Sequence, residues 1–270
     1  IECADRVSTV SPRYAEEIQS AEYSHGLHHV LYRNAHKLCG ILNGIDYDYY
    51  NPAKDEPLAK HYDRRNIISG KRANKLALQK EYGLPEREDV PMLAIISRLA
   101  SHKGLDLVSE IAYNIVSNND VQFVVLGKGE SRFENFFSEL ERAYPDKVRA
   151  LLTYDRDLSK KIYAACDIFI MPSKSEPCGL SQMIASRYGA MPVVRETGGL
   201  YDSIKGYWVD NGEIKGNGFT FANYSSYELR DRIEAALALY HDEKQYKKFV
   251  AKITGTDFSW ASSAEKYMEM

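Results

Sequence analysis

Short apolar segments alternate with segments of helical periodicity along residues 91–194, and this alternation constrains the fold more than any other feature. Met92–Ile96 is apolar throughout, which is typical of a strand buried on both faces of a sheet. The other strand-like segments are Val121–Leu126, Val148–Leu152, Asp167–Met171 and Met191–Val194. Helical segments separate them, over Gly104–Val116, up to Ala143, and over Leu158–Ala165 and Leu180–Tyr188. We therefore predict an α/β fold with a Rossmann-like, doubly wound parallel sheet.

Further elements are expected on both sides of this region. A short strand over Arg6–Val10 precedes a helix with Ser11 at its N-cap and Pro12 at its first position. We also predict a strand and a turn over Gly40–Asp46, since the Asn-Gly pair there tolerates positive φ. The remaining predicted helices are Lys71–Tyr82, which Gly83 closes, Ser225–Tyr240, Glu243–Ile253 and Ser259–Met268.

Length and charge exclude several classes of protein. The 270 residues allow one large domain or two modest ones, with a real hydrophobic core. Lys plus Arg number 35 and Asp plus Glu number 38, so the net charge of -3 gives no general attraction to nucleic acid or to an anionic membrane. The four cysteines form no C-x-x-C pair, which argues against a disulfide framework or a zinc ribbon and favours reduced thiols.

No targeting or membrane segment is recognisable. No apolar run approaches the roughly 18 residues that a spanning helix needs. The sequence begins with Ile1 in place of Met and has no signal-peptide pattern, so we expect a chain entered in the middle of a longer protein. Together with the reduced cysteines, this predicts a cytoplasmic location.

Ligands of such sheets bind beyond the carboxyl ends of the strands, so the residues directly after each strand are candidates. Arg98 and Lys103 follow the first regular strand, where two cations beside a helix start form either a diphosphate site or a solvated surface pair. Gly127 and Gly129 follow the second strand and permit close backbone approach, although the third glycine of a dinucleotide fingerprint is absent. Tyr154, after the third strand, either stacks on a base or packs half-buried in the core.

The fourth strand precedes the densest group of candidates. Glu176 lies before a helix whose first amides are expected to be those of Gly179 and Leu180, and these amides with the helix dipole would bind a phosphate. The Glu176 carboxylate is then either functional or a helix cap, capping being the commoner case. Cys178 has no partnered histidine, so a packed thiol is favoured over a nucleophile.

Two Asp-x-Asp sequences, at Asp46–Asp48 and Asp155–Asp157, have the pattern with which metal-dependent sugar transferases hold a divalent cation. Both are expected in solvated loops, where aspartate pairs are common. No spacing of His or Cys typical of a metal site is present. We therefore expect neither a metal nor a cofactor.

Six motifs follow one another in a fixed order and identify a family. They are V-S-P-R-Y-A-E-E-I at Val10–Ile18, G-I-L-N-G-I-D at Gly40–Asp46, S-R-L-x-x-H-K-G-L-D-L at Ser97–Leu107, L-G-K-G-E at Leu126–Glu130, P-S-K-S-E-P-C-G-L-S-Q at Pro172–Gln182 and V-R-E-T-G-G-L at Val194–Leu200. Gly218-Phe219 and F-S-W at Phe258–Trp260 complete the set. Over essentially its whole length the chain resembles the C-terminal half of bacterial glycogen synthases and plant starch synthases, glycosyltransferase family 5, with the GT-B fold.

The resemblance implies roles for the candidate residues. Arg98 and Lys103 would hold the diphosphate of a nucleotide-sugar, usually ADP-glucose, and Glu176 would face the glucosyl ring near its anomeric carbon. The other implied donor-binding positions are Asn43, Gly127, Gly129, Tyr154, Cys178, Gly179, Leu180 and Ser181. The implied reaction transfers glucose, with retention, to the non-reducing end of an α-1,4-glucan. It needs no metal, because cations and a helix dipole neutralise the leaving diphosphate.

The sequence departs from the family pattern at three positions. His102 stands where Gln is usual, Ser175 where an aromatic residue is usual, and Ile184 where the wider GT-B signature has a second glutamate. The change at position 102 puts the donor contacts of this loop in doubt.

The largest departure concerns the N-terminal domain of the family, whose K-x-G-G-L loop does not precede Gly40. We expect residues 1–36 to be the last strand and helix of that otherwise missing domain. Residues 37–255 would form the nucleotide-sugar-binding domain and residues 256–270 a crossover helix. The isolated chain is predicted to bind nucleotide weakly and to transfer no glucose.

Three alternatives stay open. Another GT-B transferase would use UDP-glucose or a different acceptor. A non-catalytic nucleotide-sugar or glucan-binding module would keep the fold, although Arg98, Lys103 and Glu176 together argue against a loss of catalysis. An NAD-dependent oxidoreductase fits the sheet, but the third glycine and an acidic residue placed to bind ribose are absent.

Overall fold

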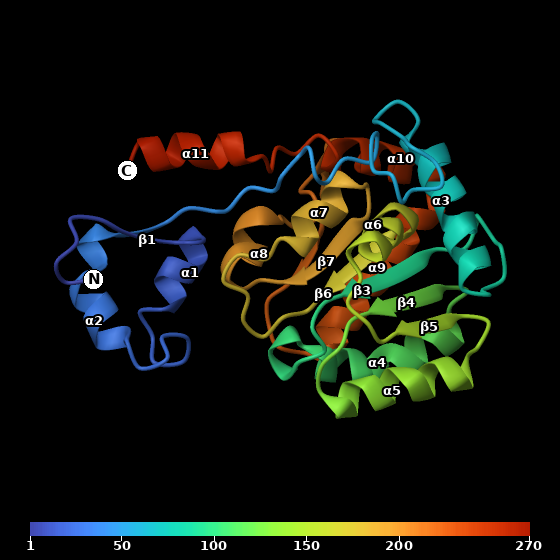
Figure 1. The fold of residues 1–270 in the computed structure, drawn as a ribbon, viewed down its shortest axis with the longest axis horizontal. Coiled ribbons are helices and arrows are strands. Elements are labelled where there is room, and N and C mark those ends of the chain that lie inside the picture. The colour runs from blue at the N-terminus through green and yellow to red at the C-terminus, as the bar shows by residue number, and fades with distance from the viewer.

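The computed structural model describes residues 1–270 and is built around a six-stranded parallel sheet in the order β10-β7-β6-β3-β4-β5 (Figure 1). The strands are β3 (Met92–Ile96), β4 (Gln122–Leu126), β5 (Val148–Leu151), β6 (Ile168–Met171), β7 (Met191–Arg195) and β10 (Phe219–Phe221). All residues of β6 are buried and all are apolar, as expected of a central strand covered on both faces.

Helices cover both faces of the sheet, so the predicted doubly wound fold is confirmed. α4 (Leu105–Asn118) packs beside α5 (Ser131–Ala143) and α9 (Ser226–His241). α3 (Ile67–Glu81) packs beside α6 (Arg156–Ala165) on the other face, followed by α7 (Ser181–Arg187) and α10 (Glu243–Ile253). The buried residues of α4 recur at helical spacing and give it one apolar face toward the sheet: Leu105, Val108, Ile111, Ala112, Ile115 and Val116.

The direction of the chain across the sheet reverses at β3. From β3 the chain runs outward through β4 to β5, and it then returns to the other side of β3 as β6. The chain therefore leaves β3 and β6 toward opposite sides of the sheet, and a crevice is expected beyond the carboxyl ends of these strands.

Several elements differ from the predictions. Of the segment Gly40–Asp46, predicted as a strand and a turn, only Gly40 lies in a strand, β2 (Leu38–Gly40), which ends there because its partner β1 (Val7–Thr9) ends at Thr9. The edge strand β10 was not predicted, because three residues are too few to show a period. The glycine turn after β7 contains a short helix, α8 (Gly198–Ser203), which its two leading glycines disguise in the sequence.

Residues 1–40 form a small layer of their own beside the main sheet (Figure 1). β1 and β2 pair in parallel, and α1 (Pro12–Glu17) and α2 (His28–Arg33) complete the layer. Ser11 caps α1 as predicted, since its hydroxyl accepts a hydrogen bond from Tyr14 N. From the main body, α11 (Trp260–Met268) runs back toward this layer, and the Ser263 hydroxyl donates to the Leu42 carbonyl at 2.7 Å.

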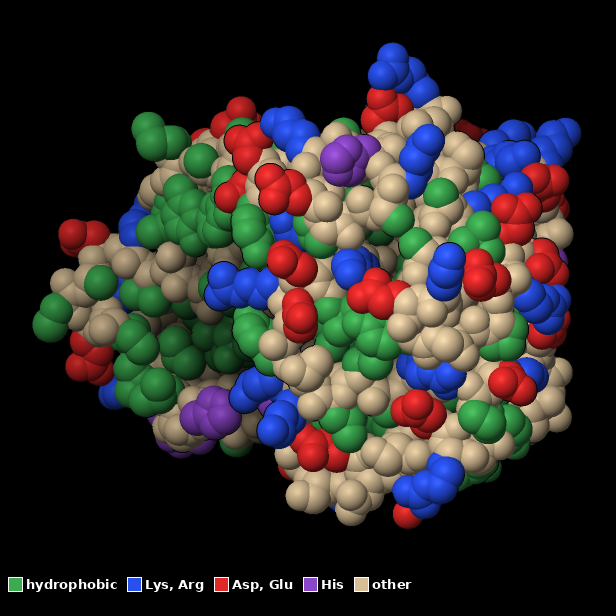
Figure 2. All heavy atoms as spheres, turned by 45° about the vertical axis from the view of Figure 1, so that its right-hand side comes forward, with side chains coloured by type: hydrophobic (Ala, Val, Ile, Leu, Met, Phe, Trp, Pro, Cys, Tyr) green, Lys and Arg blue, Asp and Glu red, His purple; other side chains and the backbone are tan.

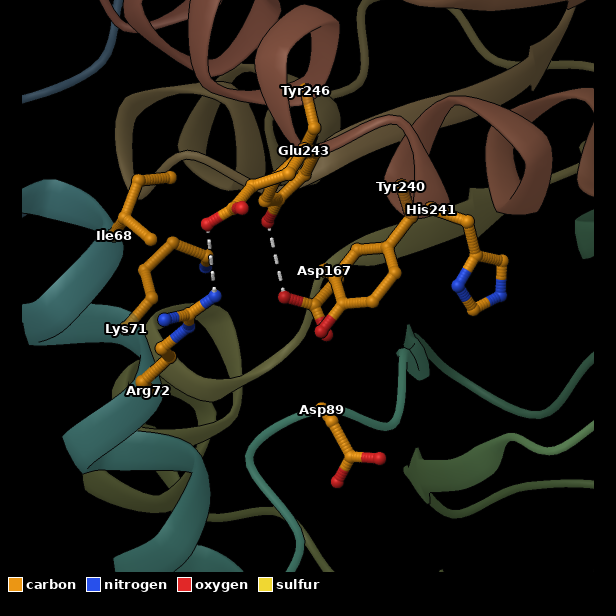
Figure 3. Close-up of a pocket in the computed structure, with 9 residues that line it drawn as sticks. All are labelled: Ile68, Lys71, Arg72, Asp89, Asp167, Tyr240, His241, Glu243 and Tyr246. Atoms are coloured by element: carbon orange, nitrogen blue, oxygen red, sulfur yellow. Dashed lines mark hydrogen bonds and ion pairs between the residues drawn. The ribbon is translucent and has the colours of Figure 1, made fainter.

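A buried charged cluster lies at the end of the sheet opposite to the crevice. Asp167 accepts a hydrogen bond from the Tyr246 hydroxyl at 3.1 Å (Figure 3) and another from Met92 N at 2.8 Å. Lys75 Nζ lies 2.6 Å from Asp167 Oδ2. These groups join α3, β3, β6 and α10 beside a cavity of about 170 Å³.

Hydrophobic side chains gather on the surface of the N-terminal layer, on the left of Figure 2. The large exposed apolar residues of this layer and of α11 include Ile1, Leu27, Tyr32, Trp260 and Met268. None of the helices is both long enough and apolar enough to cross a membrane.

Candidate functional site

The loops after β3 and β6 meet at the crevice and bring two of the candidate residues together. Lys103 Nζ lies 2.6 Å from Glu176 Oε2, and the Ser173 hydroxyl donates to the same oxygen at 3.0 Å. The two charged side chains are 16% and 10% exposed, so water screens their attraction far less than that of a surface pair. Glu176 is therefore held by a lysine and a hydroxyl and does not act as a helix cap.

Gly104 allows these two loops to approach each other. It lies between a short 3-10 turn, η2 (Ser101–Lys103), and α4, with a φ of 70° that favours glycine. A Cβ at this position would clash with the carbonyl oxygen of Pro172, so a larger residue would push the loops apart. Lys174 N also donates to the His102 carbonyl at 2.9 Å, which ties the loops together at a second point.

Arg98 lies in the same loop as Lys103 and lines a cavity that neither Lys103 nor Glu176 lines. Its Nη2 is 3.5 Å from His102 Nε2. Partial burial, reinforced by the charges of Lys103 and Arg98, lowers the pKa of His102. The imidazole is consequently neutral at neutral pH, and the positive charge of the site comes from the arginine and the lysine.

A cavity of about 540 Å³ extends from Arg98 across the carboxyl ends of β3, β4 and β5. Its lining includes Gly127, Tyr154, Leu180 and Ser181 from the candidate residues. Tyr154 is 81% exposed, so the alternative of a half-buried core tyrosine is wrong. Its hydroxyl accepts a hydrogen bond from Arg156 Nε at 3.3 Å, which leaves the face of the ring open to a ligand.

Gly127 and Gly129 are glycines for a reason internal to the protein. A Cβ on Gly127 would clash with the carbonyl oxygen of Ser97, and a Cβ on Gly129 with that of Leu99. The loop after β4 therefore packs directly against the loop after β3. This close approach of two main chains, and not only the approach of a ligand, explains the two glycines.

The start of α7 differs slightly from the prediction. The helix begins at Ser181, so Gly179 and Leu180 precede it, with Gly179 in the left-handed conformation at a φ of 68°. The Cys178 thiol is buried, and burial raises its pKa to about 11. It is therefore protonated at neutral pH, in agreement with a packed thiol.

Sequence reasoning missed a residue that supports the Glu176 loop. Glu17, at the end of α1, accepts a hydrogen bond from Gly198 N at 2.9 Å and another from the Thr197 hydroxyl at 3.2 Å. In turn, Gly199 N donates to the Glu176 carbonyl at 3.0 Å. The only sequence signal for this contact is the second glutamate of Y-A-E-E-I, which by itself resembles an ordinary exposed helix residue.

Two further features of the site concern the segment after β2. Tyr49 and Tyr50 line the cavity, although no motif in the sequence indicates a role for these two residues. Asn43 does not line it, and its main-chain N–H faces the Cys178 thiol. The wall of the cavity is thus built partly by a loop that has no regular periodicity.

The first carboxylate of each Asp-x-Asp sequence accepts main-chain hydrogen bonds. Asp46 Oδ1 accepts from Asp48 N at 2.8 Å and from Tyr49 N at 2.9 Å. Asp155 caps α6 by accepting from Leu158 N at 2.9 Å. Both first aspartates therefore have a structural role in turns and caps.

Comparisons with known proteins agree with this geometry. Residues 74–253 match the family model described as glycosyl transferases group 1, and residues 1–33 match the starch synthase catalytic domain. The glycogen synthase of Bacillus licheniformis is 46% identical over 267 residues, which cover 99% of this chain and 54% of the relative. The glycogen synthase of Streptococcus sanguinis is 48% identical over 268 residues, with coverages of 99% and 56%.

A solved structure extends the likeness to three dimensions. The catalytic domain of starch synthase IV from Arabidopsis thaliana, bound to ADP and acarbose, matches with a TM-score of 0.90 at 41% identity. The match covers 98% of this chain and 55% of that chain, so the chain spans about half the length of the relatives that it matches. These matches argue against the oxidoreductase alternative. The parallel sheet and the loop pair at the crevice agree with the family match over residues 74–253. The chain therefore belongs to the group 1 glycosyltransferases, and among them it is similar to the glycogen and starch synthases.

Proposed function

We propose that the full-length protein is a glycogen synthase. It transfers glucose from ADP-glucose, with retention of configuration, to the 4-OH at the non-reducing end of an α-1,4-glucan. The observation that carries the proposal is the Lys103–Glu176 ion pair at 2.6 Å, which joins the loops after β3 and β6 where the strand order reverses. It supports the proposal because a cation and a carboxylate lie side by side, and Arg98, in the same loop as Lys103, lines a cavity of about 540 Å³, a volume suited to a nucleotide.

Each side chain has a separate task in this proposal. Arg98 and Lys103 bind the diphosphate and neutralise the charge that develops on it as its bond to glucose breaks. Glu176 faces the glucosyl ring near the anomeric carbon, and Tyr154 lies against the base. The remaining donor contacts are assigned to Asn43, Gly127, Gly129, Cys178, Gly179, Leu180 and Ser181. Since Lys103 pairs with Glu176 in the free chain, donor binding would draw the ammonium group toward the phosphate.

The proposed chemistry is a front-side displacement. The bond between C1 of glucose and the phosphate oxygen breaks, and the bond from C1 to the acceptor O4 forms on the same face. The acceptor proton passes to the leaving phosphate, so that one carboxylate near the reaction centre suffices. The proposal includes no metal and no cofactor, because Arg98 and Lys103 carry the neutralising charge.

The acceptor side of the cleft is assigned to an N-terminal domain of the same protein. The support is that this chain spans 54–56% of the length of its glycogen synthase relatives, and that apolar side chains are exposed on the N-terminal layer. In this proposal residues 1–36 complete that domain, residues 37–255 bind the nucleotide-sugar, and residues 256–270 cross between the two. The isolated chain is expected to bind nucleotide weakly and to transfer no glucose.

A glucose-transfer assay on the full-length protein tests the function. With glycogen as primer and ADP-glucose or UDP-glucose as donor, we expect polymer growth with ADP-glucose and a loss of roughly 100-fold in kcat for Lys103→Ala. Lys161→Ala is the matched control, because that lysine pairs with a surface glutamate, Glu81. Preference for UDP-glucose would favour the alternative donor, nucleotide binding without transfer would favour a binding module, and inversion at C1 would refute the front-side mechanism.

A further inference from the structure

One wall of the 540 Å³ cavity does not come from the sheet. Tyr49 and Tyr50 line it, and they belong to a long connection between β2 and α3 that contains no helix and no strand apart from an isolated β-bridge at Ile45. Tyr49 is 41% exposed, and Tyr50 is half-buried. A connection of this length does not hold two aromatic rings in place unless other contacts tie it down.

A buried ion pair ties this connection to α6. Lys160 Nζ lies 2.8 Å from Asp55 Oδ1 and donates to the Tyr49 carbonyl at 2.6 Å. The side chains of Lys160 and Asp55 are 9% and 4% exposed. The same ammonium group lies 4.0 Å from the centre of the Tyr49 ring, a cation–π contact. One lysine therefore contacts both the main chain and the ring of a residue that lines the cavity.

The second carboxylate oxygen of Asp55 connects this ion pair to the core. It accepts hydrogen bonds from the Tyr188 hydroxyl and from Asn51 N, the latter at 3.3 Å. Tyr188 is fully buried at the end of α7. Both charged groups of the Lys160–Asp55 pair thus have partners, and removal of Lys160 would leave the buried Asp55 carboxylate without its cation.

The three tyrosines are close enough to act on one ligand. Burial, with the nearby Tyr49 and Tyr154 hydroxyls, raises the pKa of Tyr50. Arg156 lies near both Tyr154 and Tyr49. A flat aromatic ligand that enters the cavity beside Tyr154 would therefore meet the Tyr49–Tyr50 segment on another side. Contact between a nucleobase and an aromatic side chain contributes substantially to affinity and does not depend on the identity of the base.

We propose that Lys160 is a positioning residue for nucleotide binding, which holds the Tyr49–Tyr50 segment in place as a second wall of the base pocket. The inference rests on the proposed function, because it takes the cavity to be the nucleotide site. Lys160 does not contact the reacting atoms. Its loss should therefore weaken the binding of the nucleotide and leave the transfer step itself unchanged.

The test compares Lys160→Met with Lys161→Met in the full-length protein. We expect Lys160→Met to raise the Kd for ADP and the KM for ADP-glucose roughly 10-fold, the size of one base–aromatic contact, with kcat at saturating donor unchanged. Lys161→Met should change neither, since that side chain pairs with Glu81 at the surface. Tyr49→Ala should weaken ADP binding to a similar extent, and Lys160→Met should add little to it.

A second variant and a hydrogen-exchange measurement distinguish a loss of positioning from a loss of folding. If Lys160→Met folds poorly, Lys160→Met/Asp55→Asn removes the unpaired charge and should show the same loss of ADP affinity. Hydrogen exchange of residues 46–55 in the nucleotide-free protein should accelerate in Lys160→Met and not in Lys161→Met. Unchanged exchange, or an unchanged Kd with a reduced kcat, would overturn the proposal. Failure of the wild-type protein to bind ADP would instead refute the proposed function, and the exchange result would still decide whether Lys160 holds the segment.

Discussion

Replacement of Lys75 by methionine tests the buried charged cluster below the sheet. Lys75 Nζ lies 2.6 Å from Asp167 Oδ2, and the two side chains are 1% and 4% exposed. Methionine keeps an apolar side chain of similar length but removes the charge. The Asp167 carboxylate would then retain only its hydrogen bonds from Met92 N and the Tyr246 hydroxyl.

The expected cost follows from the burial of this pair. Removal of one partner of a buried ion pair destabilises a protein by about 3–5 kcal/mol, because the remaining charge is uncompensated. Lys71 does not take over, since its ammonium group already donates to the carbonyls of Tyr163, Ala164 and Tyr188. For a chain of this size the loss corresponds to a decrease in Tm of roughly 6–20 °C.

Urea unfolding followed by far-UV circular dichroism measures the change. The exposed pair of Lys161 with Glu81 provides the control, because loss of a surface pair costs about 0–1 kcal/mol. In Lys75→Met/Asp167→Asn we expect much of the stability to return, since asparagine still accepts from Met92 N without a charge. A loss below about 1 kcal/mol in Lys75→Met, or no recovery in the double variant, would refute the reasoning.

Three further predictions concern the site. In the full-length protein, Glu17→Ala should lower kcat roughly 10-fold with little change in ADP affinity, because Glu17 supports the turn that holds the Glu176 loop. Glu17→Gln still accepts the hydrogen bonds, so its kcat should stay close to that of the wild type. Partial burial, reinforced by the charges of Lys103 and Arg98, lowers the pKa of His102 in the free protein, and a bound diphosphate would raise it by offsetting the two cations. Just below pH 6.5, ADP binding should therefore take up more protons in the wild-type protein than in His102→Gln, which calorimetry in buffers of different ionisation enthalpy measures. Iodoacetamide at neutral pH should label the exposed Cys3 and leave Cys178 unmodified, because burial raises the pKa of the Cys178 thiol to about 11. Labelling of both cysteines at similar rates would contradict the conclusion that Cys178 is packed in the core.

The sheet was predictable because its strands are locally distinct. The bounds of β3, Met92–Ile96, agree with the sequence prediction, since a strand buried on both faces is apolar at every position. β10 was missed because it is short and lies at the edge, where burial leaves a weaker pattern. Local sequence thus identifies the central strands and the edge strand β5, but not the three-residue edge strand β10.

The site was predictable in part, for a related reason. Because parallel strands end at one edge of a sheet, Lys103 and Glu176 were both identified as candidates after their strands, whereas the ion pair that joins them was not predicted. Glu17 could not be predicted, since its partner Thr197 lies 180 residues away and only the folded chain brings them together. Gly127 and Gly129 show the converse case: their need for glycine comes from main-chain packing, which the sequence does not distinguish from the approach of a ligand.

The proposed glucose transfer depends most on Glu176, which lies where the β3 and β6 loops meet. The decisive measurement is kcat for glucose transfer from ADP-glucose to glycogen by full-length Glu176→Gln, with the Kd for ADP determined in parallel. We predict a decrease in kcat of at least roughly 100-fold. ADP affinity should be unchanged or higher, because Lys103 is released from its ion pair with the carboxylate. A variant that transfers glucose at the wild-type rate would contradict the account.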